Sequence, residues 1–323
     1  MVRSPYKWFK FLAVSAIGTF LTFPLKAIGT SASPELTSVA TPSTSHLNWL
    51  QAIVLGMVQG LTEFLPISST AHLKVVPVAL GWGDPGVTFT AIIQLGSIGA
   101  VLWYFWSDLT LMVKGVIKAI RTSDYQSNEF RMALGIVLGT IPIVFFGLLI
   151  KKFIPDFDNS PLRSMTVIAS ASIVMGLLLG IAEQIGKRKR NFEDLDVRDG
   201  VLMGLAQALA LIPGVSRSGS TITAGLFISL ERATAARFSF LLGIPSITLA
   251  GLVELKDAIE TGLGDAGWVS LIVGVISAAV FSYIAIAWLI RYLQTQNTWI
   301  FVWYRLVFGA AILGALATGV LQN

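Results

Sequence analysis

Long apolar runs alternate with short polar segments along most of this chain. Runs of about 20 apolar residues are long enough to cross a bilayer as helices. The charged residues are concentrated between the runs, as expected when the runs themselves are embedded in lipid. The pattern therefore predicts an all-α, polytopic membrane protein. Six full spans are expected, at about residues 88–106, 131–150, 165–186, 233–254, 267–290 and 300–321.

Two further apolar stretches are interrupted by proline and are short on both sides of the break. The first covers residues 47–80 and breaks at Leu65–Pro66, and the second covers residues 197–230 and breaks at 212–214. Proline cannot continue a helix, and it pushes the preceding residue out of the α region. Broken backbone at membrane depth is tolerated only where protein or a water-filled cavity surrounds it. We therefore predict two re-entrant helical hairpins.

The two hairpins resemble each other in sequence. Residues 56–61 (GMVQGL) are similar to residues 204–209 (GLAQAL), and a serine-containing stretch follows each proline. The count of spans between them places the first hairpin as entering from outside and the second from the cytoplasm. Paired broken helices of this kind form midplane sites in many transporters. We predict an inverted repeat, with repeat one at about 47–150 and repeat two at about 197–290.

Residues 1–46 differ from the rest of the chain. Three basic residues precede an apolar run at about 11–28, and a linker rich in serine, threonine and proline follows. This layout fits a cleaved signal peptide and an uncleaved membrane anchor equally well. The membrane-embedded domain is predicted to cover residues 47–323.

Composition supports the membrane assignment and excludes several kinds of site. Of the 323 residues, 54% are hydrophobic and only 13% are charged, whereas a soluble domain carries about 25% charged residues. The absence of cysteine excludes disulfides and thiolate chemistry, and two histidines make a multi-histidine zinc site improbable. The net charge of +5 lies in loops, which indicates cytoplasmic loops and anionic lipids rather than nucleic acid.

Polar side chains are concentrated around the first break, in residues 59–72. Gln59 and Glu63 are four residues apart, so a helix places them on one face. A new helix is expected to begin after the proline, and the free N–H groups at a helix start favour an anion. The candidate side chains on that side of the break are Ser68, Ser69, Thr70 and His72.

The second break, at residues 213–221 (PGVSRSGST), has hydroxyls, glycines and one arginine. An arginine in an apolar hairpin costs about 2.5–3.5 kcal/mol on insertion scales. Either a buried carboxylate such as Glu63 or a bound anion would compensate Arg217. The alternative is a loop whose arginine extends to the membrane interface. The residues here that would bind phosphate are Gly214, Ser216, Ser218, Gly219 and Thr221.

Both motifs, in this order, resemble the undecaprenyl-diphosphatase family, also called bacitracin-resistance proteins. The resemblance covers about residues 47–321, with Ala71 where the family has glycine and Gln59 where many members have glutamate. It implies hydrolysis of undecaprenyl diphosphate to undecaprenyl phosphate and inorganic phosphate. This reaction recycles the lipid carrier of peptidoglycan synthesis and confers bacitracin resistance. The family's site opens to the external, periplasmic side of the bacterial inner membrane.

The resemblance also implies roles for individual residues. Arg217, with the N–H groups at the two helix starts, would hold the diphosphate. His72 would act as general base, either on Ser69 as nucleophile or on a water molecule. Glu63 would either orient His72 or, with Gln59 nearby, bind the Mg²⁺ or Ca²⁺ that the family leads us to expect. We predict that Glu63, Ser69, His72 and Arg217 surround one cavity.

Two other classes of function compete with this prediction. A polyprenyl-phosphate transporter or flippase would use the same inverted hairpins to bind phosphate, without a nucleophile. A structural membrane protein with polar breaks is less consistent with two matched polar clusters. The sequence leaves open whether the chain forms a homo-oligomer.

Overall fold

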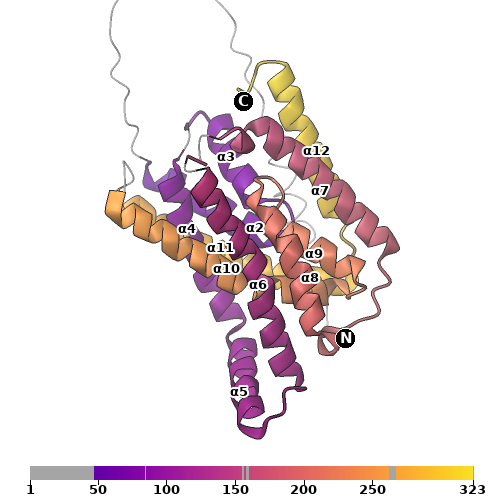
Figure 1. Ribbon diagram of the computed structural model, residues 1–323. Coiled ribbons are helices and arrows are strands. Elements are labelled where there is room, and N and C mark those ends of the chain that lie inside the picture. The colour runs from indigo at the N-terminus through magenta and orange to yellow at the C-terminus, as the bar shows by residue number, and fades with distance from the viewer. Residues whose placement is uncertain (1–46, 84, 155, 158–159, 262–266, 323) are drawn as a thin grey trace, which may run out of the picture. The chain divides into compact units, whose positions relative to one another are not determined.

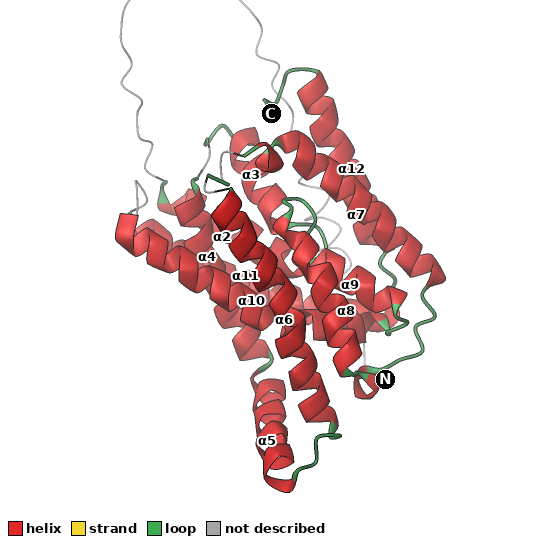
Figure 2. Ribbon diagram, in the orientation of Figure 1, coloured by secondary structure: helices red, strands yellow, loops and turns green. Residues whose placement is uncertain are grey.

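The computed structural model describes residues 47–322 except 84, 155, 158–159 and 262–266. Within this part the chain folds into helices, and the only other pairing is one isolated bridge between Arg190 and Leu230 (Figure 2). The all-α prediction is therefore confirmed. The predicted signal or anchor segment and its linker, residues 1–46, lie outside the described residues, so both alternatives stay predictions.

The two proline breaks occur where the sequence predicts them. The first broken pair consists of α2 (Trp49–Phe64) and α3 (Ser69–Ala79). The second consists of α8 (Val197–Ala208), the 3₁₀ turn η3 (Leu209–Leu211) and α9 (Arg217–Phe227).

Among the described residues, five helices are long and apolar enough to cross a membrane, and a sixth span results if the bent pair of α4 and α5 is counted as one. The coarse prediction of a multi-pass helical membrane protein is thus confirmed. The long helices are α6 (Asn128–Phe153), α7 (Met165–Ile185), α10 (Arg232–Thr261), α11 (Trp268–Thr295) and α12 (Trp299–Ala317).

The segment after the first predicted span, which ends at about residue 106, is also a helix, which the sequence did not lead us to expect. The chain bends by 66° between α4 (Val87–Tyr104) and α5 (Trp106–Thr122). One face of α5 packs on α6, while Lys114 and Lys118 are exposed. The apolar and basic residues of α5 recur with helical spacing, which explains why this segment forms a helix although it contains several charged residues.

The helices pack in two matching sets (Figure 1). In one set α11 packs on α2 and α4, and in the other α6 packs on α8 and α10. α7 packs on α12, and α4 packs on α10. The first helix of each broken pair therefore packs on one long helix, α2 on α11 and α8 on α6.

A buried apolar core lies against the end of α2. Phe64 and Phe240 are fully buried and meet edge to face with ring centroids 5.1 Å apart. This packing fixes the last turn of α2, and it holds the neighbouring Glu63 at the start of the break.

Candidate active site

Both breaks contain a serine in an unusual backbone conformation. Ser68 and Ser216 are the N-cap residues of α3 and α9, with φ of 75° and 72°. This left-handed region costs a residue other than glycine about 1–3 kcal/mol and is concentrated at functional sites. Each break therefore contains a strained turn of the same kind, and a helix starts directly after it.

Side chains hold the two turns against each other. Ser218 Oγ donates to the Leu65 carbonyl at 2.9 Å, which links the second hairpin to the first. Arg305 of α12, only 1% exposed, donates to the carbonyls of Pro66 at 3.0 Å and Gly214 at 2.7 Å. It also donates to the carbonyls of Val215 at 3.0 Å and Ser172 at 3.1 Å.

Arg305 is a site residue that the sequence analysis missed. It is an arginine within an apolar span, so it carries the same insertion cost that drew attention to Arg217. That signal was present in residues 300–321. The same residues give no sign of its partners, because these lie in the two breaks and on α7.

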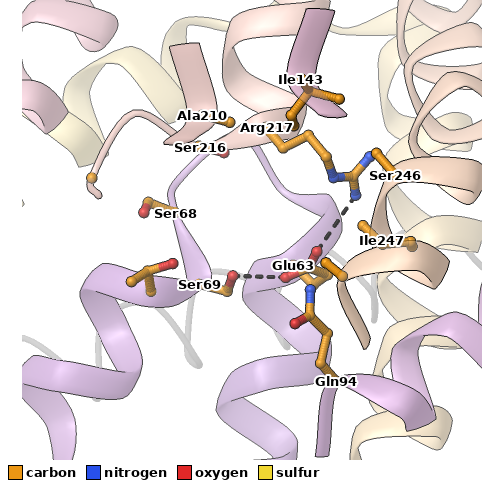
Figure 3. Close-up of a pocket in the computed structure, with 13 residues that line it drawn as sticks. Glu63, Ser68, Ser69, Gln94, Ile143, Ala210, Ser216, Arg217, Ser246 and Ile247 are labelled. Carbon is orange, nitrogen blue, oxygen red and sulfur yellow. Dashed lines mark hydrogen bonds and ion pairs between the residues drawn. The ribbon is translucent and has the colours of Figure 1, made fainter. Parts of the chain in front are cut away.

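A cavity of about 200 Å³ opens between the two breaks. Figure 3 shows Glu63 of the first hairpin and Arg217 of the second pointing toward one another across it. The apolar part of the wall includes Ile143, Ala210 and Ile247. The predicted site residues that line it are Glu63, Ser68, Ser69, Thr70, Gly214, Ser216 and Arg217.

Glu63 is the centre of the polar contacts in this cavity. Ser69 Oγ donates to Glu63 Oε2 at 2.7 Å, and Gln59 Nε2 donates to the same oxygen at 3.1 Å. Arg217 Nη2 lies 3.5 Å from Glu63 Oε1, and the two side chains are only 9% and 7% exposed. The carboxylate thus accepts a hydrogen bond from a hydroxyl on one side and faces a buried cation on the other.

Arg217 has more hydrogen-bonding capacity than the protein satisfies. Within the described part of the chain, its buried Nε and Nη1 atoms have no hydrogen-bond partner. A buried donor without a partner costs about 1–3 kcal/mol, and an arginine fork matches phosphate oxygens. A Cβ on Gly243 would lie 1.6 Å from Nη1, so glycine is needed there for the guanidinium to reach the cavity. The positive charge and the unpaired N–H groups of Arg217 therefore favour the binding of an anion in this cavity.

The structure does not place His72 beside these residues. Its Nδ1 lies 2.7 Å from the Ser68 carbonyl, its Nε2 lies 2.5 Å from the Tyr304 hydroxyl, and its ring stacks on Phe308 at 4.4 Å. It is absent from the cavity wall. Since a carbonyl only accepts, Nδ1 carries the proton and Nε2 accepts from Tyr304. The expectation that His72 shares the cavity with Ser69 is thus corrected, and its role as general base stays a prediction without a supporting contact.

Three other predicted phosphate ligands lie behind the cavity wall. Ser218 and Thr221 are fully buried, and Gly219 donates its N–H to Ser216 Oγ at 3.1 Å. Thr221 Oγ1 is 2.5 Å from Ser239 Oγ, on α10. These residues build the loop that carries Arg217, and their direct contact with phosphate stays a prediction.

The donors around the cavity do not form a cage for a metal ion. No group of three histidine, aspartate or glutamate side chains that could hold a metal occurs among the described residues. Glu63 is the one carboxylate among the described residues that line this cavity, and it already accepts from Ser69 and Gln59. A Mg²⁺ or Ca²⁺ held by protein ligands alone does not fit this set.

Comparison with known proteins identifies the family. Residues 52–311 match the family model described as bacitracin resistance protein BacA. The undecaprenyl-diphosphatase of Trichormus variabilis is 68% identical over 318 residues, which cover 98% of each chain. That of Synechococcus elongatus is 65% identical over 285 residues, 88% of this chain and 99% of the relative. This chain belongs to the bacitracin resistance protein BacA family.

Proposed function

We propose that the protein hydrolyses undecaprenyl diphosphate to undecaprenyl phosphate and inorganic phosphate. Relatives that are 68% and 65% identical bear the name of this activity. One observation of the structure supports it most strongly. A hydroxyl, a carboxylate and an arginine with unpaired N–H groups meet in one cavity, where Ser69 Oγ donates to Glu63 at 2.7 Å.

The proposed reaction uses Ser69 as nucleophile and Glu63 as base. Ser69 Oγ forms a bond to the terminal phosphorus while its proton passes to Glu63, and the bond from that phosphorus to the bridging oxygen breaks. Undecaprenyl phosphate leaves. As it leaves, Glu63 passes the serine proton to the phosphate oxygen freed by the cleavage and becomes a carboxylate again. Water then attacks the phosphoserine, Glu63 takes a proton from this water, and Glu63 returns that proton to the serine oxygen as the bond from phosphorus to that oxygen breaks. Direct attack by a water held on Glu63 is the alternative that the Ser69→Ala variant tests.

Arg217 and the helix starts supply the stabilisation of charge. The phosphoryl oxygens carry most of the charge in this kind of transition state, so fixed donors are more useful than further nucleophiles. The unpaired Nε and Nη1 of Arg217 are such donors, and the starts of α3 and α9 add the positive ends of two helix dipoles. The Glu63 pair orients Arg217 before the substrate binds.

His72 has a positioning role in this proposal. Its ring donates to the Ser68 carbonyl, within the strained turn that aims Ser69 at the cavity. The bond from Tyr304 fixes the tautomer that makes this donation. Replacing His72 would therefore reduce activity through the orientation of Ser69.

The expected Mg²⁺ or Ca²⁺ would enter bound to the diphosphate. A divalent cation neutralises phosphate charge and prefers oxygen ligands, and Glu63, the carboxylate in the wall of this cavity among the described residues, would share it. No step above depends on this ion.

The finer membrane arrangement is also part of the proposal. Six spans and two re-entrant hairpins would form an inverted repeat, which the two matching sets of packed helices and the similar φ values at Ser68 and Ser216 support. The basic loop at residues 187–190 would lie in the cytoplasm. The cavity would then open to the external face of the bacterial inner membrane.

The test is phosphate release from undecaprenyl diphosphate by purified protein in detergent, with divalent cations supplied. Arg217→Ala should lose at least about a hundredfold in kcat/KM, which corresponds to about 2.7 kcal/mol of transition-state stabilisation. Lys118→Ala, on the exposed face of α5, should retain the wild-type rate. No release by a folded wild type that still binds the lipid would contradict the proposal and favour the transporter.

A further inference from the structure

A second cavity of about 220 Å³ adjoins the first. Glu63, Ser69 and Thr70 line both cavities. The nucleophilic hydroxyl of the proposed reaction therefore faces two compartments. Each could receive one of the two products.

The outer walls of the two cavities differ in chemistry. Beyond Arg217, the first has apolar residues such as Ile143 and Ile247, which suit a phosphate attached to a prenyl chain. The second extends to two cationic side chains, Lys74 and Arg163. A small, fully water-soluble anion would be favoured there over a lipid.

Three structural elements bring these charges to the second cavity. Lys74 lies four residues after Thr70 on α3, so both face the same side of the helix. Its Nζ donates to the carbonyl of Arg163 at 2.5 Å, in the 3₁₀ turn η1 (Pro161–Arg163) that precedes α7. Glu254 of α10 also lines this cavity. The charged side chains in this wall are Lys74, Arg163, Glu254 and Glu63, and Glu63 also pairs with Arg217.

We propose that this second cavity is a binding site for inorganic phosphate, through which the released phosphate leaves Ser69. The inference rests on the proposed function, and it assigns the two products to different sides of the nucleophile. Lys74 and Arg163 contribute charge and hydrogen-bond donors that neither the family match nor the catalytic proposal uses. Occupation of the site by free phosphate would then inhibit turnover.

The experiment uses inorganic phosphate as the probe in two measurements. The first is inhibition of wild-type turnover by added phosphate. The second is phosphate binding to Ser69→Ala by calorimetry in detergent, which needs no turnover. Lys74→Gln should weaken both by about tenfold, the loss typical of one charge-assisted hydrogen bond. Lys74→Arg should restore most of the effect, and Lys118→Gln, at an exposed position on α5, should change neither.

A second variant tests the same site if the Lys74→Gln protein does not fold. Arg163→Gln removes the other cation but keeps the backbone carbonyl that holds Lys74, so the link between α3 and η1 remains. It should also weaken phosphate inhibition, with the KM for the lipid diphosphate within about twofold of wild type. A raised KM with unchanged phosphate inhibition would overturn the inference, since the cations would then hold the lipid headgroup.

The two proposals fail separately. Wild-type protein that hydrolyses the lipid but binds no phosphate up to about 10 mM, where the binding free energy would fall below about 3 kcal/mol, overturns this inference alone. Protein that binds phosphate through Lys74 but releases none from undecaprenyl diphosphate retains the site and contradicts the proposed function.

Discussion

At the scale of single residues, the site consists of buried polar groups whose partners lie on distant segments. Glu63 and Arg217 are 154 residues apart in sequence and 3.5 Å apart in space. Breaking a buried pair by removing one partner leaves the other charge uncompensated, which is strongly destabilising. The pair therefore serves folding and substrate binding together, and variants at neighbouring positions separate the two roles better than variants of the pair itself.

Gly243→Ala is such a neighbouring variant. The added Cβ would lie 1.6 Å from Arg217 Nη1, so the guanidinium must move away from the cavity. Alanine is a better helix former than glycine by about 1 kcal/mol. We therefore expect kcat/KM for phosphate release to fall by at least about tenfold (about 1.4 kcal/mol) while the protein stays folded.

Thermal unfolding in detergent, measured beside the kinetics, checks that the Gly243→Ala protein is intact. Gly267→Ala is the matched control, because a Cβ there meets no atom within 4 Å. Full activity in Gly243→Ala would show that the orientation of Arg217 does not limit the reaction.

Arg305→Met tests the residue that joins the two turns. The loss of the guanidinium leaves the carbonyls of Pro66, Gly214 and Val215 without this donor. Each buried acceptor left unpaired costs about 1–3 kcal/mol, so we expect a lower unfolding temperature and a reduced rate. Lys118→Met, on an exposed face, should affect neither. Unchanged stability in Arg305→Met would mean that the turns hold each other without it.

At the scale of elements, ion pairs fix the helix ends that carry the hairpins. Glu183, at the end of α7, accepts from Arg232 at the start of α10 and from Thr298 before α12. At the start of α8, Asp196 forms an ion pair with Arg131 of α6 at 2.7 Å. These contacts hold the ends of four long helices and of the second hairpin in register.

The Asp196 pair predicts a pH dependence of stability. The hydrogen bond from Arg131 holds the pKa of the Asp196 carboxyl below its ordinary value. A lowered folded-state pKa stabilises the fold above the unfolded-state pKa, and the effect is lost as pH falls through the folded-state pKa. Arg131→Gln should therefore unfold at a lower temperature than wild type at pH 7, and the difference should shrink at acid pH. A difference that is constant with pH would rule out the ion pair as its origin.

At the scale of the whole molecule, the proposed membrane orientation rests on the distribution of basic loops. Because the chain has no cysteine, single-cysteine variants can report it cleanly. Lys187 and Lys256 are both exposed and lie on opposite sides in the proposed topology. A membrane-impermeant maleimide added to spheroplasts should label Lys256→Cys and should not label Lys187→Cys. Labelling of Lys187→Cys alone would show that the topology is the opposite of the proposed one and that the cavity opens to the cytoplasmic side.

The membrane class, both breaks and the family were predictable because each depends on local pattern. Apolar run length predicts spans, and proline predicts the two breaks, which follow α2 and the 3₁₀ turn η3. The helix α5 was not predicted because Lys114, Lys118 and Arg121 favour a basic loop, although the apolar positions of this segment have helical spacing. The insertion cost of Arg305 is visible in the sequence, but its role is not, because the carbonyls that it binds at Pro66, Gly214 and Val215 lie 90 or more residues away.

The sequence by itself determined which side chains were available for chemistry, since buried charges such as Glu63 and Arg217 are too costly in a membrane to be without a partner or a ligand. Only the tertiary structure decided how they are used. Ser69 faces Glu63, whereas Ser218 faces the Leu65 carbonyl and His72 faces Tyr304. The physical reason is that these orientations depend on long-range contacts, 232 residues apart for His72 and Tyr304, and no local pattern encodes which of several adjacent hydroxyls a distant helix will bind.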